Sequence, residues 1–284
     1  PWRSERIANF SARRSLPVWR RDAFAPEESV LGRPDGPEVV LLADTFNTYF
    51  EPENLHSALR VLTVAGYRVH LARPADGGRP LCCGRTFLAA GLVEQAKAEA
   101  QRMLAVLKPF AERGVPVIGL EPSCLLTLRD EFKSMLPGRA VGKLAERAML
   151  FEEFLATEQA AGRLALPLRP LPQKRALLHG HCHQKAFAAM GDVTAALKLI
   201  PGLEVAVIES SCCGMAGAFG YEAAHYEVSM KMAELSLLPA VRRADPGALL
   251  VADGTSCRHQ IHDGAGRAAE HVAVVLARAL PLPS

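Results

Sequence analysis

The sequence lacks two features that would place it in a membrane or outside the cell. It has no continuous run of about 18 apolar residues, the length that a membrane-spanning helix needs, and no charged-then-apolar secretion signal. Both absences predict a cytoplasmic protein. Peripheral attachment at the inner face of a membrane stays open as an alternative. The net charge is only +3, so no nucleic-acid partner is expected.

The composition also lacks the marks of disorder. Apolar residues make up 49% of the chain and charged residues 22%, as in globular proteins with a sizeable core. With 284 residues the chain exceeds the usual size of one domain, roughly 100–200 residues. We therefore expect two domains or one duplicated domain.

The positive charge gathers at the start of the chain. Residues 1–37 contain five prolines and no sustained apolar period. We interpret them as an exposed Arg/Pro-rich linker from an upstream domain, with order beginning afterwards. Contact of this arm with phosphate or anionic lipid is the alternative. The missing initial Met suggests a fragment. Among the first 21 residues, six arginines face only Glu5 as a counter-charge: Arg3, Arg6, Arg13, Arg14, Arg20 and Arg21.

Seven cysteines are present without an export signal. A reducing cytosol keeps thiols free, and an odd number of thiols cannot all pair. Disulfides are therefore not expected, and the cysteines indicate metal binding or redox chemistry.

Apolar patterning predicts alternating strands and helices. Short apolar runs typical of buried parallel strands alternate with segments of helical spacing. The first half is expected to contain strands at 39–43, 67–71 and 115–120 and helices at 53–65 and 88–110. The second half repeats this order, with strands at 175–179, 204–208 and 249–252, a helix at 194–200, and a helix whose apolar stripe is Tyr221, Val228, Met232 and Leu235.

Each half carries the same cysteine pattern behind its strands. A Cys-Cys-Gly follows the second strand and a Ser-Cys follows the third, and chance rarely places two such copies in register. The sequence thus predicts an α/β fold of two pseudo-symmetric Rossmann-like halves, residues 38–170 and 171–284, each with a small parallel sheet flanked by helices. The motifs are Cys82-Cys83-Gly84 with Ser123-Cys124, and Cys212-Cys213-Gly214 with Ser256-Cys257.

Four cysteines of the second half each follow a predicted strand. They should therefore meet at the carboxyl-end edge of one parallel sheet, where open α/β folds bind ligands. Four thiolates suit a [4Fe–4S] cluster or a tetrahedral zinc, but structural zinc usually uses two close Cys-x₂₋₄-Cys knuckles. Two adjacent cysteines are also poor hydrophobic core residues, because neighbouring side chains point in different directions from an extended backbone. We predict an iron–sulfur site at Cys182, Cys212, Cys213 and Cys257.

Glycines next to this motif support the prediction. Gly214 and Gly217 let backbone N–H groups approach a cluster closely, so both are candidate cofactor-binding residues. The spacing is not that of a nucleotide-binding glycine motif.

Histidines surround Cys182. His181 and His183 are candidates for hydrogen bonding to a ligand sulfur, for ligation or for proton transfer, although a helix-capping or carboxylate-pairing role is open. For His179, which is expected inside the strand, that structural role is favoured. His259 and His262 are expected to be solvated.

The first half offers only three cysteines: Cys82, Cys83 and Cys124. The position that corresponds to Cys182 falls near Asp44–Asn47, where no cysteine exists. Three possibilities follow for these three thiolates. They hold a cluster that has a non-cysteine fourth ligand such as Asp44, they hold a zinc ion, or they bind no metal. We expect a second, degenerate or differently liganded site.

With these motifs the chain resembles the Cys-Cys-Gly cysteine-rich domain family over residues 38–284. That family occurs in heterodisulfide reductases, in the glycolate oxidase iron–sulfur subunit and in anaerobic glycerol-3-phosphate dehydrogenases. The chain is most similar to the carboxyl-terminal part of fused FAD-linked oxidases of the D-lactate and D-2-hydroxyglutarate dehydrogenase type. The resemblance rests on the motifs above together with His181-Cys182-His183-Gln184-Lys185 and Asp44–Pro52.

The resemblance implies an electron-transfer domain. FAD would lie on a separate domain or subunit, and electrons would pass through a ferredoxin-like iron–sulfur domain to this chain and then to quinone or another acceptor. The chain would be an oxidoreductase component that is catalytically incomplete alone. Two alternatives remain, a cluster-based disulfide reductase component and a zinc-bound docking module.

The sequence departs from the full family pattern. Glu121 and Gly254 stand where members with non-cubane clusters carry the first cysteine of a closing Cys-x-x-Cys. An ordinary relay cluster in the second half is therefore the safer expectation.

Overall fold

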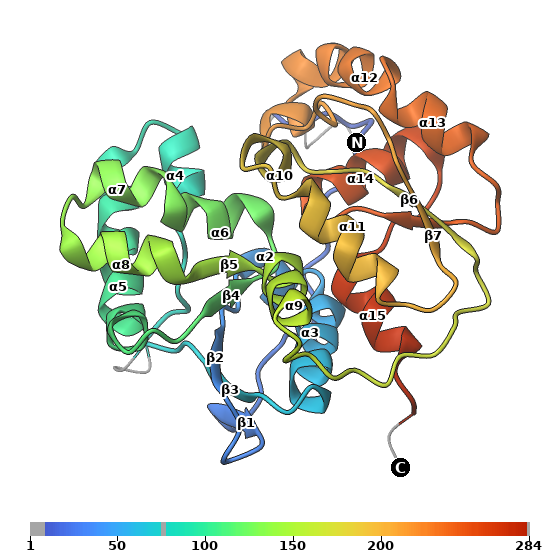
Figure 1. Ribbon diagram of the computed structural model, residues 1–284. Coiled ribbons are helices and arrows are strands. Elements are labelled where there is room, and N and C mark those ends of the chain that lie inside the picture. The colour runs from blue at the N-terminus through green and yellow to red at the C-terminus, as the bar shows by residue number, and fades with distance from the viewer. Residues whose placement is uncertain (1–8, 75–77, 283–284) are drawn as a thin grey trace.

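The computed structural model describes residues 9–74 and 78–282. Within them the chain forms two α/β halves that lie side by side, each built on its own sheet (Figure 1). The α/β architecture predicted from the sequence is confirmed. Among the described helices, none is both long enough and apolar enough to cross a membrane.

The first sheet has five strands in the order β1-β3-β2-β4-β5. β1 runs antiparallel to β3, and the other neighbours pair in parallel. The sheet is therefore mixed, which corrects the prediction of a wholly parallel sheet, because a strand from the lead segment joins its edge. The strands are β1 (Val30–Gly32), β2 (Glu38–Leu41), β3 (Arg68–Leu71), β4 (Val117–Gly119) and β5 (Ala148–Leu150).

Eight described helices accompany this sheet. The predicted helix at 88–110 is two helices, because Gly91 adopts a left-handed φ of 74° that ends one and redirects the chain into the next. The helices are α2 (Thr45–Tyr49), α3 (Pro52–Val64), α4 (Arg85–Ala89), α5 (Val93–Glu112), α6 (Pro122–Arg129), α7 (Glu131–Met135), α8 (Arg139–Arg147) and α9 (Phe151–Ala160).

The second sheet has three parallel strands in the order β7-β6-β8. The strands are β6 (Arg175–Leu178), β7 (Glu204–Val207) and β8 (Leu249–Val251). The helices are α10 (Cys182–Ala186), α11 (Met190–Lys198), α12 (Tyr226–Glu234), α13 (Leu237–Arg243), α14 (Thr255–Ala265) and α15 (Val272–Ala279), with 3₁₀ turns η1 (Phe219–Tyr221) and η2 (Ala223–His225).

The apolar stripe predicted for α12 is wrong. Val228 and Leu235 are 49% and 79% exposed, whereas Ser229 and Ala233 are buried. α12 packs against the backbone turn at Gly214, where the Ser229 carbonyl oxygen lies so close that residue 214 has no room for a side chain. Close backbone packing therefore replaces the usual apolar contact.

The lead segment is not an exposed linker over its described part. Phe24 is buried in the core, β1 is a strand of the first sheet, and the Arg14 side chain is fully buried. The expected solvated arginine arm is thus corrected for Arg14, while Arg13 and Arg20 are surface residues. Arg3 and Arg6 lie outside the described residues.

The two halves share one hydrophobic core. A single buried cluster contains residues of α3 and β3 from the first half and of β6, α11 and α15 from the second. α15 lies against α3, as Figure 1 shows. This shared core holds the carboxyl ends of the two sheets in a constant relation to each other.

Candidate metal centre

Four thiols of the second half meet at the carboxyl ends of three neighbouring strands. Cys182 begins α10 after β6, Cys212 and Cys213 lie in the loop after β7, and Cys257 lies in the first turn of α14 after β8. The thiols form a continuous series of contacts: Cys182 with Cys212, Cys212 with Cys213, and Cys213 with Cys257. The structure thus brings together the set proposed from the sequence.

The charges around these sulfurs favour thiolates at two of them. The pKa of Cys212 is lowered because the Cys182 and Cys213 thiols and the Gly214 amide donate to its sulfur. The pKa of Cys257 is lowered by the Cys213 thiol and by nearby His179 and His181. Thiolates are the form that ligates metals. The donor set therefore fits a metal or an iron–sulfur cluster.

His179 lies at the sulfurs rather than within β6. A ring nitrogen of His179 and the sulfurs of Cys213 and Cys257 all lie within 4.8 Å of one another. Its Nδ1 is 2.9 Å from Ser210 Oγ, and its buried Nε2 has no hydrogen-bond partner in the described structure. The sequence favoured a purely structural role for His179 inside the strand, whereas the structure places its ring beside two of the proposed ligands. A buried ring nitrogen without a hydrogen-bond partner that faces two thiols is suited to a metal or cluster site.

His181 caps α10, the structural role that the sequence left open. Its Nδ1 accepts from the His183 amide at 3.1 Å, and its own amide donates to Gln184 Oε1 at 2.9 Å. One ring nitrogen of each of these histidines and the Cys182 sulfur all lie within 4.8 Å of one another.

His183 faces the first half of the chain. Burial, with nearby His181 and Arg85, lowers the pKa of His183 to about 4, so its ring is neutral near pH 7. Its Nε2 accepts from Arg85 Nη2 at 3.1 Å, while Arg85 also pairs with Glu131. Because Arg85 directly follows Cys82-Cys83-Gly84, the cysteine motifs of the two halves lie next to each other.

Lys185 closes the loop before the cysteine pair. Its ammonium donates to the carbonyls of Ser210 and Ser211, the latter at 3.0 Å. Burial lowers the pKa of Lys185, but Cys257, Cys182, Cys212 and Cys213 all act in the opposite direction. A lysine close to all four sulfurs supplies positive charge where thiolates gather; the sequence named it only as part of a motif.

The two glycines proposed to approach a cofactor differ. Gly214 has a φ of 91°, and its amide donates to Cys212 Sγ at 3.3 Å. A Cβ there would lie 2.2 Å from the Ser229 carbonyl oxygen. Gly217 is exposed, and a Cβ there would meet nothing within 4 Å. Close backbone approach therefore explains Gly214, whereas Gly217 is required only for its φ of 67°.

The three cysteines of the first half also meet. Cys82 contacts Cys83, and Cys83 contacts Cys124. Gly84 donates to Cys82 Sγ at 3.4 Å, as Gly214 does in the second half. The fourth position is taken by Thr45, whose hydroxyl contacts Cys82. The sequence placed this position only near residues 44–47 and did not single out Thr45.

The surroundings of the first set oppose thiolates. The Cys83 thiol lowers the pKa of Cys124, but burial and the carboxylates of Asp44 and Glu121 raise it to about 11 overall. Asp44, the suggested fourth ligand, caps α2: its Oδ1 accepts from the Phe46 and Asn47 amides and its Oδ2 from the Asn47 side chain. Both oxygens of Asp44 are thus already engaged.

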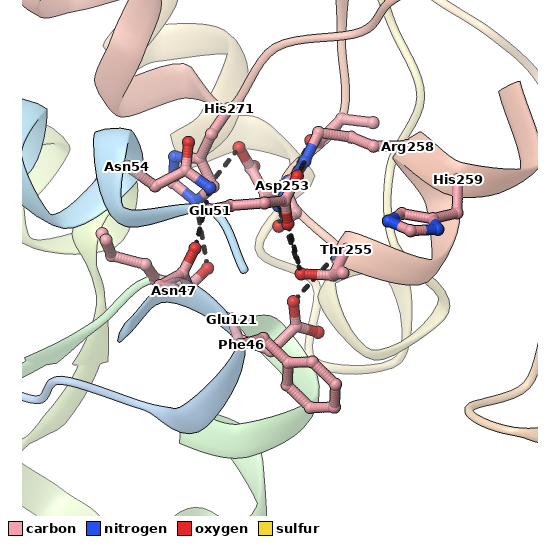
Figure 2. Close-up of polar contacts among 12 residues, drawn as sticks. Phe46, Asn47, Glu51, Asn54, Glu121, Asp253, Thr255, Arg258, His259 and His271 are labelled. Carbon is pink, nitrogen blue, oxygen red and sulfur yellow. Dashed lines mark hydrogen bonds and ion pairs between the residues drawn. The ribbon is translucent and has the colours of Figure 1, made fainter. Parts of the chain in front are cut away.

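A buried polar network joins the halves beside these sites. Glu51 accepts from Arg258 Nε and from Thr255 Oγ1, each at 2.8 Å, and the Thr255 amide donates to Glu121 at 2.9 Å. Figure 2 shows Glu51 between Arg258 and Thr255, with Glu121 on the far side of Thr255. His259 lies near this network and 3.0 Å from the Tyr221 hydroxyl, so it is not simply solvated, whereas His262 is exposed.

Comparison with known proteins agrees with this site. Residues 176–262, which include all four cysteines of the second half, match the family described as cysteine-rich domain, with the short name CCG. These residues belong to the cysteine-rich domain family. The resemblance drawn from the motifs is confirmed, and the matched residues of this chain run from β6 into α14.

The chain as a whole is similar to dehydrogenases and to a dehydrogenase subunit. It is 29% identical over 246 residues to one subunit of the anaerobic glycerol-3-phosphate dehydrogenase of Escherichia coli (strain K12), covering 86% of this chain and 59% of that subunit. It is 32% identical over 231 residues to the D-2-hydroxyglutarate dehydrogenase of Pseudomonas putida, covering 78% of this chain and 20% of that protein. The corresponding Escherichia coli (strain K12) enzyme is 27% identical over 235 residues, covering 82% of this chain and 22% of that protein. The chain thus spans about three-fifths of the first relative and about one-fifth of the second.

Proposed function

We propose that the chain is the iron–sulfur electron-transfer part of a flavin-linked dehydrogenase. The observation that carries the proposal is the contact series of four thiols in the second half, two of them with a lowered pKa, beside Lys185 and His179. Cys182, Cys212, Cys213 and Cys257 would hold a [4Fe–4S] cluster. When bound, such a cluster accepts and donates single electrons.

The residues around the thiols support this role rather than bond-making chemistry. The Gly214 amide and the Lys185 ammonium stabilise negative charge on the sulfurs. Cys182 is exposed, whereas Cys213 and Cys257 are buried. One edge of the site is therefore open to a partner, and the other is shielded from water, as suits electron exchange.

The names of the relatives support the proposed partners. Glycerol-3-phosphate and D-2-hydroxyglutarate, named for the relatives, both carry a secondary alcohol, whose oxidation releases a hydride that flavins accept. FAD would be held on a separate domain or subunit, with a ferredoxin-like domain between it and this chain. Quinone or another acceptor, at the inner face of the membrane or in the cytoplasm, would take the electrons next.

The first half has a different proposed role. Three thiols with Thr45 in the fourth position make a weaker donor set than four thiols, and the carboxylates of Asp44 and Glu121 raise the pKa of Cys124. We propose a degenerate site that holds zinc or no metal. Zinc tolerates three protein ligands with a fourth position open.

Metal analysis of anaerobically purified protein tests the proposal. We expect about four iron and four sulfide per chain and broad absorption typical of [4Fe–4S] clusters. Replacing any of Cys182, Cys212, Cys213 or Cys257 by Ser should remove most of the iron. The matched variants Cys82→Ser, Cys83→Ser and Cys124→Ser should keep it. Zinc without iron, or full iron content in Cys257→Ser, would contradict the assignment.

A further inference from the structure

Arg14 is buried beside the proposed cluster site although it precedes the first half in sequence. Its side chain has no solvent exposure. Its Nε donates to the Gly220 carbonyl at 2.8 Å, its Nη1 to Gln260 Oε1 at 2.5 Å, and its Nη2 to Ser229 Oγ at 2.7 Å. Such a fully engaged guanidinium is costly to bury and holds its partners in fixed positions.

The groups that Arg14 joins belong to two cysteine-bearing segments. Gly220 ends the turn that follows Cys213, since its amide donates to the Met215 carbonyl at 2.8 Å. Gln260 lies one turn after Cys257 on α14. Arg14 therefore connects the loop that carries Cys212 and Cys213 to the helix that carries Cys257.

The neighbours of Arg14 fasten the same region. The Ser11 amide donates to the Tyr221 carbonyl at 2.7 Å, and the Asn9 carbonyl accepts from Ala223 at 2.9 Å. Phe10 packs against the apolar cluster that includes Cys213 and Cys257. Residues 9–15 thus form a strap, which lies beside α12 and α14 in Figure 1.

We propose that Arg14 is a positioning residue of the metal centre and that its buried charge raises the reduction potential of that centre. The second part rests on the proposed function. Reduction adds negative charge to a cluster, and a cation in a poorly solvated position nearby stabilises the reduced form. Asp263 Oδ2, 3.6 Å from Arg14 Nη1, offsets part of that charge.

Redox titration of the iron-loaded full chain, followed by electron paramagnetic resonance, tests the electrostatic part. We expect Arg14→Gln to lower the reduction potential and Arg14→Lys, which keeps the charge, to lie nearer the wild type. The matched control is Arg13→Gln, because Arg13 is 60% exposed and pairs with exposed Glu227; it should leave the potential unchanged. An unchanged potential in Arg14→Gln, or an equal shift in Arg13→Gln, would overturn this part.

A second variant covers the case in which Arg14→Gln takes up no iron. Asp263→Asn leaves the Arg14 charge without its counter-charge, so the potential should rise. An unchanged or lower potential in Asp263→Asn would also overturn the electrostatic part.

Hydrogen exchange of metal-free protein tests the positioning part independently of any cluster. Both Arg14→Gln and Arg14→Lys remove the guanidinium that bonds Gly220, Gln260 and Ser229 together. The amides of residues 214–221 should therefore exchange faster in both variants, while Arg13→Gln should match the wild type. Unchanged exchange in both Arg14 variants would overturn positioning. If wild-type protein carries no iron, the proposed function fails, but the exchange result still decides the role of Arg14.

Discussion

Thr45 and Cys182 occupy equivalent positions in the two halves. Each is the first residue of the short helix after the central strand, and each side chain contacts the first cysteine of its own Cys-Cys-Gly motif, Cys82 or Cys212. The cap residues before them, Asp44 and His181, also correspond. A single hydroxyl-for-thiol difference therefore separates the donor sets of the two sites.

Thr45→Cys should convert the first half into a four-thiol site. We expect the variant to bind zinc at this site at least tenfold more tightly than the wild type, because four thiolates complete the tetrahedral set that zinc prefers. Zinc titration of metal-free protein against a competing chelator measures this. Thr48→Cys is the control, since it adds a buried thiol near the end of the same helix α2, away from the helix start that contacts Cys82. Equal zinc binding by Thr45→Cys and the wild type would show that the first site cannot be completed by a thiol.

Gly214 and Gly217 lie in the same loop but are glycines for different physical reasons. Both have positive φ, at 91° and 67°, but only Gly214 is pressed against another backbone, with 2.2 Å from its missing Cβ to the Ser229 carbonyl oxygen. Gly217→Ala should cost about 1–2 kcal/mol for the left-handed conformation alone. Gly214→Ala should cost more than that, because α12 must move, and it should lower iron content as well.

Urea unfolding of both alanine variants and iron analysis of the anaerobic proteins check this prediction. Equal losses of stability in the two variants would mean that the contact with α12 contributes nothing. Gly84 offers a parallel case in the first half, where a Cβ would lie 2.8 Å from the Ala96 carbonyl oxygen. Gly84→Ala should destabilise the protein while leaving the iron content near the wild-type value.

Glu51 should make stability depend on pH in acid. Burial alone would raise its pKa, but Arg258 and Thr255 hold the pKa of Glu51 at about 2, against an ordinary value of 4.5. A carboxyl with a depressed pKa stabilises the fold above its unfolded pKa, and that contribution is lost as pH falls from about 4.5 towards 2. The shift corresponds to about 3 kcal/mol.

Glu51→Gln should remove this acid dependence and destabilise the protein at neutral pH by about 3–5 kcal/mol, because buried Arg258 loses its partner. Urea titrations of metal-free protein between about pH 2 and about pH 7 measure both effects. Glu53→Gln is the matched control: its ion pair with Arg20 is exposed, so the change should stay within about 0.5 kcal/mol. A Glu51→Gln variant that keeps the steep acid dependence would assign it to another carboxyl.

Local pattern determined much of the framework from the sequence alone. The sequence predicted helix α3 and four strands to within one or two residues; the strands are 38–41, 68–71, 175–178 and 204–207. It could do so because hydrophobic periodicity and flanking glycines are properties of residues that are neighbours in sequence. The meeting of the four second-half cysteines was also predictable, since parallel strands deliver their carboxyl ends to one edge.

Only the tertiary structure decided which other side chains surround those sulfurs. Arg14 is far from Cys257 in sequence and looked like one of six solvated arginines, yet it reaches Gln260. His179 looked like a strand residue, and Thr45 had no signal of its own. The roles of Arg14 and His179 arise from contacts between segments that are distant in sequence, which no local hydrophobic period encodes. The role of Thr45 depends on which residue of the first half corresponds to Cys182, and that correspondence is visible only once both halves are folded against their shared core.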